Sequence, residues 1–204
     1  MKHLKIFGLA AIAGMALVAF LGAGSASATR LCSTNTSPCP EAWNYFTGTN
    51  VSMSLQESST LETTGGTVLD TCNEATLQGP TTTFGGATET VKILLTSVTW
   101  GSCTRTTNTL SNGELELHWS GATGNGTITG RGTEWTVNTV FGTCVYGFGP
   151  FGVDLGTVKG GNPASVSINA LIPKISGNFV CPSEARWTAN YRVTSPWPLY
   201  VVTA

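Results

Sequence analysis

The chain is poor in the side chains that enzymes use for polar catalysis. Only 10% of its 204 residues are charged, and beyond Ala28 it contains one histidine, His118, and two aspartates, Asp70 and Asp154. It has no Gly-x-Ser-x-Gly run and no Ser-His-Asp order, so the nucleophile signatures of hydrolases are missing. The composition therefore favours a protein that is not an enzyme.

Basic side chains are also scarce, which argues against nucleic-acid binding. The chain has ten Lys and Arg against eleven Asp and Glu, a net charge of −1. Loss of Lys2 and Lys5 with an N-terminal leader would leave eight against eleven, a net charge of −3. A phosphate backbone needs a cluster of cations, so we expect no nucleic-acid partner.

The N-terminus has the three parts of a secretory signal peptide. A basic start, Met1–Lys5, precedes an uncharged stretch, Ile6–Gly24, and the small residues Ser25–Ala28. We predict cleavage after Ala28, so that residues 1–28 are a signal peptide and residues 29–204 form a single β domain. Removing 28 of the 204 residues leaves 176, which suits one globular domain.

Membrane attachment is a weaker interpretation of the same segment. Four glycines dilute its apolar character, and they are Gly8, Gly14, Gly22 and Gly24. Three residues separate the cleavage point from Cys32, so a lipid anchor is not expected. No later stretch is long and apolar enough to span a bilayer, and we expect a secreted protein, free outside the cell or held at its surface.

All six cysteines follow the predicted cleavage site and would enter an oxidising compartment. No Cys-x-x-Cys pair accompanies histidines, so neither a zinc site nor another metal or cofactor is expected. The short Pro- and Ser-rich loop between Cys32 and Cys39 favours that pair, and sequential pairing then gives Cys72–Cys103 and Cys144–Cys181. The alternative links Cys103 to Cys144, because residues 99–103 and 140–144 have similar sequences.

The mature chain has the pattern of an all-β protein. Turn residues such as Gly65-Gly66 and Gly79-Pro80 recur along the chain, with short runs of alternating apolar residues between them. Those runs are Val51, Met53, Leu55; Leu115, Leu117, Trp119; Trp135, Val137; Val166, Ile168, Ala170; and Trp187, Ala189, Tyr191, Val193. We predict an antiparallel β-sandwich or partly open barrel of roughly 8–12 short strands, stapled by disulfides.

Asn112-Gly113 is the strongest local turn signal. Both residue types tolerate the positive φ of a type I′ turn, so we predict a two-residue hairpin that pairs Leu110 with Leu115. Its core face would hold Leu110, Leu115, Leu117 and Trp119, with Glu114, Glu116 and His118 on the other face.

Several segments together resemble a group of secreted actinobacterial proteins with no assigned function. They are residues 113–119, 125–129, 134–139, 144–147, 160–164, 187–189 and 195–201. The resemblance spans most of the chain, the leader included. It implies secretion and a disulfide-bonded β domain, and it transfers no activity, ligand or catalytic residue.

Glu114, Glu116 and His118 are the candidates for a catalytic or metal site. Alternate residues of a strand lie about 6.5–7 Å apart on one face, close enough to share a proton or a metal. Alternation with leucines already explains the pattern as a solvated face, which is the favoured interpretation. The alternative function is a secreted, glycan-directed hydrolase using these residues, with Glu134 as a candidate second carboxylate across a cleft.

Four aromatic residues in loop-like or terminal stretches are the candidates for ligand binding. Trp43, Tyr45, Trp197 and Tyr200 lie in loop-like or terminal stretches, where rings either pack the chain ends or stack against sugars. Arg186, Thr188, Asn190 and Arg192 alternate on the last long strand as a solvated stripe or as ion-pair partners of Glu residues. We expect a non-enzymatic extracellular or cell-surface interaction module, whose partner is a cell-wall glycan or an extracellular protein.

Overall fold

The computed structural model describes residues 28–85 and 89–204. This part of the chain is antiparallel β structure with one 3-10 turn, η1 (Glu41–Trp43), and none of its helices is long and apolar enough to span a membrane. The predicted signal peptide, apart from Ala28, lies outside the described residues. The strands are β1 (Thr29–Cys32), β2 (Asn50–Leu55), β3 (Ser59–Thr63), β4 (Val68–Pro80), β5 (Val91–Leu94), β6 (Ser97–Cys103), β7 (Thr107–Ser111), β8 (Glu114–Trp119), β9 (Asn125–Arg131), β10 (Glu134–Thr139), β11 (Gly142–Gly147), β12 (Val153–Lys159), β13 (Ser165–Gly177), β14 (Glu184–Ser195) and β15 (Tyr200–Thr203).

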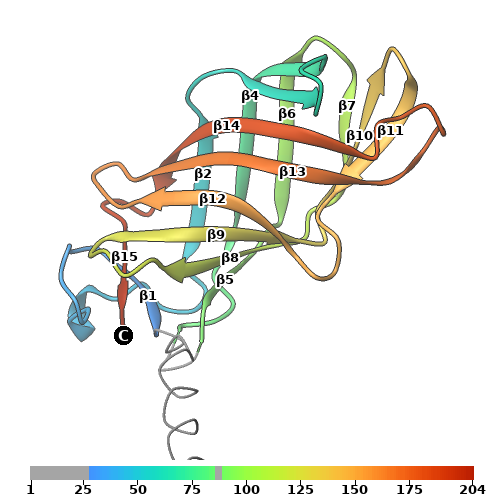
Figure 1. The fold of residues 1–204 in the computed structure, drawn as a ribbon. Coiled ribbons are helices and arrows are strands. Elements are labelled where there is room, and N and C mark those ends of the chain that lie inside the picture. Colours follow the sequence, from blue (N-terminus) through green and yellow to red (C-terminus); the bar gives the residue numbers. More distant parts are fainter. Residues whose placement is uncertain (1–27, 86–88) are drawn as a thin grey trace, which may run out of the picture.

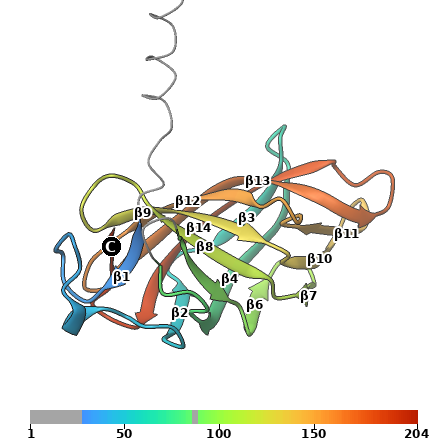
Figure 2. The ribbon, with the colours of Figure 1, turned by 90° about the horizontal axis from the view of Figure 1, so that it is seen from below.

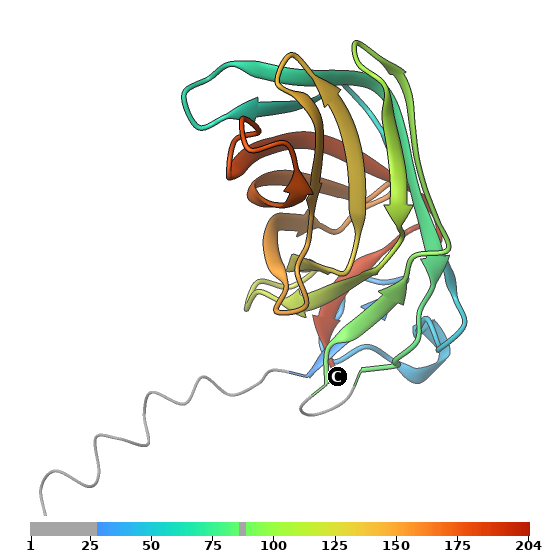
Figure 3. The same cartoon turned by 90° about the vertical axis from the view of Figure 1, so that its right-hand side faces the viewer.

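The predicted fold class is confirmed, with more strands in the described residues than the sequence suggested. The larger sheet runs β5-β8-β9-β12-β13-β14, then through β2 and β3 to β4. It curves back on itself (Figure 3), and the Thr82 amide donates to the Lys92 carbonyl at 2.8 Å where the end of β4 meets β5. The chain thus forms a sheet whose first and last strands touch.

A second group of strands extends the sheet at the far end of the molecule. β6 pairs with β4, β7 with β10, β10 with β11, and β11 with the end of β13. The long strands β4 and β13 therefore belong to both groups (Figure 1). A separate two-stranded sheet of β1 and β15 lies at the opposite end (Figure 2).

Alternation along the strands builds the core. On β14, for example, Ala185 to Val193 are buried at every second position, and the residues between them face outward. Trp187 packs its ring 5.7 Å from that of Trp135 and 6.0 Å from that of Phe148. These aromatic contacts join the two groups of strands into one apolar interior.

The predicted hairpin at Asn112-Gly113 is wrong. β7 pairs with β10, whereas β8 pairs with β5 and β9. Of the two turn residues only Gly113 has a positive φ, and Leu110 is 58% exposed instead of facing the core. The Thr133 hydroxyl donates to the Asn112 carbonyl, and the Asn112 side-chain amide donates to the Thr96 carbonyl. Contacts with distant segments therefore decide the conformation of this link.

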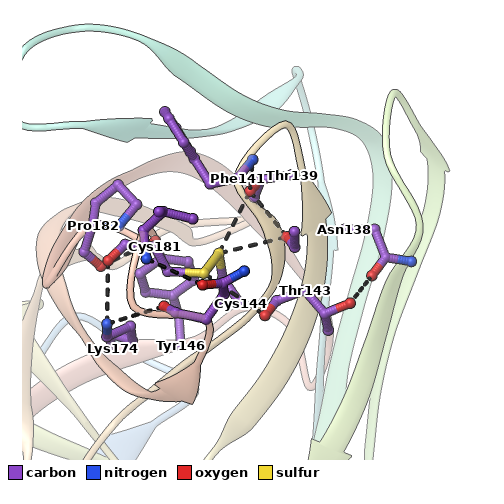
Figure 4. The surroundings of a disulfide bond; sticks show 12 residues. Asn138, Thr139, Phe141, Thr143, Cys144, Tyr146, Lys174, Cys181 and Pro182 are labelled. Carbon is purple, nitrogen blue, oxygen red and sulfur yellow. Dashed lines mark hydrogen bonds between the residues drawn. A yellow bond between two sulfur atoms is a disulfide. The ribbon is translucent and has the colours of Figure 1, made fainter.

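The structure contains the cysteine pairs favoured by the sequence. They are Cys32–Cys39, Cys72–Cys103 and Cys144–Cys181, and no cysteine of the described residues is free. The last pair holds the β10–β11 hairpin against the loop between β13 and β14 (Figure 4). In the same place the Lys174 ammonium donates to the Cys181 carbonyl at 3.2 Å. Cys72 lies directly opposite Cys103 on the paired strands β4 and β6, so this disulfide joins two neighbouring strands of the sheet.

Candidate functional site

Glu116 is part of an ion-pair cluster on the outward face of β8. It lies between Lys92 of β5 and Arg131 of β9, and its side chain is 10% exposed. The Arg131 Nε donates to its Oε2 at 2.9 Å, and the Thr90 hydroxyl donates to its Oε1 at 2.9 Å. The Lys92 ammonium lies 3.6 Å from the same Oε1 and 3.5 Å from Glu114 Oε1. The carboxylates predicted for this face are therefore neutralised by cations from both neighbouring strands.

The electrostatics of Glu116 do not suit a general acid. Burial alone would raise its pKa, but the hydrogen bonds from Arg131 and Thr90 and the charges of Arg131 and Lys92 outweigh burial, so the pKa lies below its ordinary value. A glycosidase acid needs a raised pKa. His118, half-buried, lies opposite Thr127, and Glu134 lies on β10, which pairs with β7 and β11 rather than β8.

Asp70 is a buried carboxylate that sequence reasoning did not single out. Its side chain accepts hydrogen bonds from the backbone amides of Thr71 and Arg105, at 2.8 Å each, and from the Thr104 and Thr107 hydroxyls. This arrangement pins the connection between β6 and β7 to β4. One sequence signal was available, since Asp is rare in the mature chain and Asp70 interrupts a run of strand-forming residues.

The groups next to Asp70 are poor ligands for a metal ion. Its carboxylate and the sulfurs of Cys72 and Cys103 lie within 4.8 Å of one another. The two sulfurs are joined in a disulfide, so they are not thiolates and cannot act as the soft ligands that zinc prefers. The Asp70 carboxylate instead accepts hydrogen bonds from the backbone amides of Thr71 and Arg105.

The four aromatic candidates lie at the end of the molecule that carries β1 and β15 (Figure 1). The Tyr45 hydroxyl donates to the Pro198 carbonyl at 2.7 Å, which joins the segment of Trp43 to that of Trp197. Burial raises the pKa of Tyr45. Tyr200 packs on the buried Cys32–Cys39 disulfide, so both tyrosines hold the chain ends in place.

The two tryptophans have a different environment. Trp43 is 54% exposed and Trp197 is 64% exposed. Trp197 lines an open pocket of about 300 Å³ together with Pro163, Arg192 and Thr194. This pocket lies between the turn that follows β12 and the end of β14, and its lining residues include a tryptophan, an arginine and a threonine. The Thr194 hydroxyl donates to the Ser52 carbonyl at 3.2 Å. Such a combination of residues is typical of sites that bind polar ring-shaped ligands.

The polar stripe of β14 faces outward as predicted. Arg186 lies opposite Glu62 in the sheet and donates to the Asn169 side-chain oxygen at 2.8 Å. Arg192 lies opposite Ser165 on one side and Ser54 on the other. The two arginines of the stripe therefore differ, because the neighbours of Arg192 carry no charge.

Comparison of the chain with protein-family models, with curated proteins and with solved structures finds no match. The function must therefore be argued from the chain's own residues.

Proposed function

We propose that this protein is a secreted, non-enzymatic module that binds an extracellular glycan at the end carrying Trp197. One observation carries the proposal: a tryptophan ring, 64% exposed, forms part of an open pocket that also contains Arg192 and Thr194. Sugars present apolar C–H groups on one face and hydroxyls around the ring, so an aromatic surface beside polar side chains matches both.

Other features support an interaction module over a hydrolase. The carboxylates of β8 are occupied by Lys92 and Arg131, and the buried Asp70 is occupied by four hydrogen-bond donors. The three disulfides are consistent with a protein that works outside the cell. A rigid, disulfide-bonded sheet also suits binding by a preformed surface.

The test is a pull-down of the purified, oxidised protein on isolated cell wall and on immobilised polysaccharides, with tryptophan fluorescence as a second readout. We expect binding to glycan and a blue shift of the emission as Trp197 leaves water. Trp197→Ala should abolish both, whereas Phe179→Ala, which removes a ring that is 91% exposed, should change neither.

Two results would contradict the proposal. One is recovery of an extracellular protein with no retention on any glycan, which would favour a protein partner. The other is turnover of a polysaccharide that Glu116→Gln abolishes, which would establish the hydrolase alternative.

A further inference from the structure

Two cations lie in one row across the outer face of the sheet. The row crosses neighbouring strands at Lys159 of β12, Ser165 of β13, Arg192 of β14 and Ser54 of β2, each residue paired with the next. Strands are spaced about 4.8 Å apart, so the backbones of Lys159 and Arg192 are about 10 Å apart. Both cationic residues are exposed. We call these four residues the basic row.

The cations of the basic row differ from most others in the described structure. Lys92 and Arg131 are paired with Glu116, Lys174 donates to backbone carbonyls, and Arg186 donates to Asn169. The side chains of Lys159 and Arg192 make no hydrogen bond or ion pair with any described residue. Their charge is therefore available to a ligand.

The outward residues next to the basic row on its own strands are polar and uncharged. The exposed Glu57 follows Ser54 by three residues, in a link whose Gln56 amide donates to the Asn190 carbonyl at 2.9 Å. The next row along the same strands consists of Thr157, Ser167 and Asn190, all outward and neutral. The carboxylates on these strands, Asp154 and Glu184, lie near the opposite ends of β12 and β14. In a chain whose mature net charge is −3, this is a local excess of positive charge beside hydroxyl and amide groups.

The basic row is continuous with the aromatic pocket. Arg192 belongs to both, and Pro163 of the pocket follows Lys159 closely in the turn between β12 and β13. A ligand that stacks on Trp197 therefore lies next to a guanidinium, and a longer ligand reaches the ammonium of Lys159.

We propose that the ligand of this surface is an acidic polysaccharide, one whose sugars carry carboxylates, and this inference rests on the proposed glycan-binding function. Arg192 would take one carboxylate through two parallel N–H donors, and Lys159 would take another as a point charge. Ser54 and Ser165 beside them offer hydroxyls for the uncharged sugar groups. Trp197 would hold a ring at the end of the row.

The experiment compares polygalacturonate with its methyl ester, which has the same backbone without the charge. Alginate and hyaluronate serve as further carboxylated probes, and affinity is measured by calorimetry on the oxidised protein. We expect binding to at least one acidic polymer and to polygalacturonate over its ester, weakened by added salt. Arg192→Gln and Lys159→Gln should each weaken binding about tenfold, as loss of a charge-assisted contact predicts.

Arg105→Gln is the matched control, because it removes the same charge from an exposed residue on the connection between β6 and β7. Equal affinity for polygalacturonate and its ester, unchanged in Arg192→Gln but lost in Trp197→Ala, would overturn the acidic ligand and leave the glycan-binding function standing. Absence of binding to all three acidic polymers would also overturn the inference. Failure of the glycan-binding function itself would appear as no retention on neutral or acidic glycans alike.

Discussion

Glu116 illustrates how one residue's role depends on both of its neighbouring strands. A carboxylate that is 8% exposed, counted over the whole residue, costs free energy unless it is paired. Lys92 and Arg131 supply that pairing from β5 and β9, and the Thr90 hydroxyl completes it. The cluster therefore links three strands through a single side chain. We expect this cluster to stabilise the fold, and the contribution should appear as a dependence of stability on pH.

We expect Glu116→Gln to lower the free energy of unfolding by about 1–2 kcal/mol at neutral pH, because Arg131 and Lys92 lose their shared partner. The pKa of Glu116 lies below its ordinary value, so its stabilising contribution is present above the unfolded pKa of about 4.3. That contribution is lost as the pH falls through the lower, folded pKa. Urea unfolding across pH should show wild type and variant converging in acid.

Glu57→Gln is the control for this prediction, because Glu57 is exposed and its replacement leaves the cluster intact. A Glu116→Gln variant as stable as the wild type at neutral pH would contradict the assigned role. A difference that stays constant down to acid pH would contradict it as well.

At the scale of elements, the link between β7 and β8 shows that local sequence can indicate a turn without determining which strands pair. Asn112-Gly113 has the residues of a hairpin turn, yet it carries the chain from a strand paired with β10 to one paired with β5 and β9. Gly113 has a φ of 66°, and an added Cβ there would overlap the backbone of Arg131 and Thr133. Glycine is needed at position 113 because the backbone there contacts the backbone of residues 131–133.

Gly113→Ala should therefore destabilise the protein by about 3 kcal/mol or more, since backbone strain and a steric clash with backbone atoms act together. Gly66→Ala is a matched comparison: Gly66 also has a positive φ, 85°, but nothing lies within 4 Å of the added Cβ. We expect Gly66→Ala to lower the free energy of unfolding by only about 1 kcal/mol, because it introduces backbone strain without a steric clash. Thermal and urea unfolding measure both. Equal losses in the two variants would show that the close approach at Gly113 is unimportant.

Several of the strands were predictable, but their partners were not. Alternation predicted the buried and exposed faces of the last long strand. Strand pairing depends on long-range contacts that turn residues do not encode, so the hairpin prediction failed. The pocket at Trp197 was out of reach for the same reason: it needs Pro163 and Arg192, which come from different elements.

At the scale of the whole molecule, three disulfides add covalent links to the contacts of the sheet. The disulfides span 7, 31 and 37 residues of sequence. Chain entropy assigns roughly 2.5 kcal/mol to the shortest loop and roughly 3.7 kcal/mol to each longer one. Partly additive, they contribute on the order of 6 to 10 kcal/mol, comparable with the whole stability of a domain.

Reduction of the three disulfides should therefore unfold the protein or lower its melting temperature sharply at neutral pH, as circular dichroism will show. Replacing Cys72 and Cys103 by alanine should cost more than replacing Cys32 and Cys39, because the longer loop restricts the unfolded chain more. Peptide mapping of the unreduced protein checks the pairing. A reduced protein with the same melting temperature as the oxidised protein would contradict the prediction. A disulfide between Cys103 and Cys144 would contradict the connectivity.

The pairing of β1 with β15 also determines how the molecule responds to mechanical force. Thr29 lies opposite Thr203, and Cys32 lies opposite Tyr200, so the outer ends of the two strands sit side by side. Tension applied at those ends separates the two strands from their outer ends inward, so that their hydrogen bonds break one after another. The opening first frees the segment up to Cys32, whose bond to Cys39 keeps the next seven residues from extending. A protein pulled at both ends would thus begin to open at its smaller sheet, losing the packing of Leu31 and Val201 in the main core.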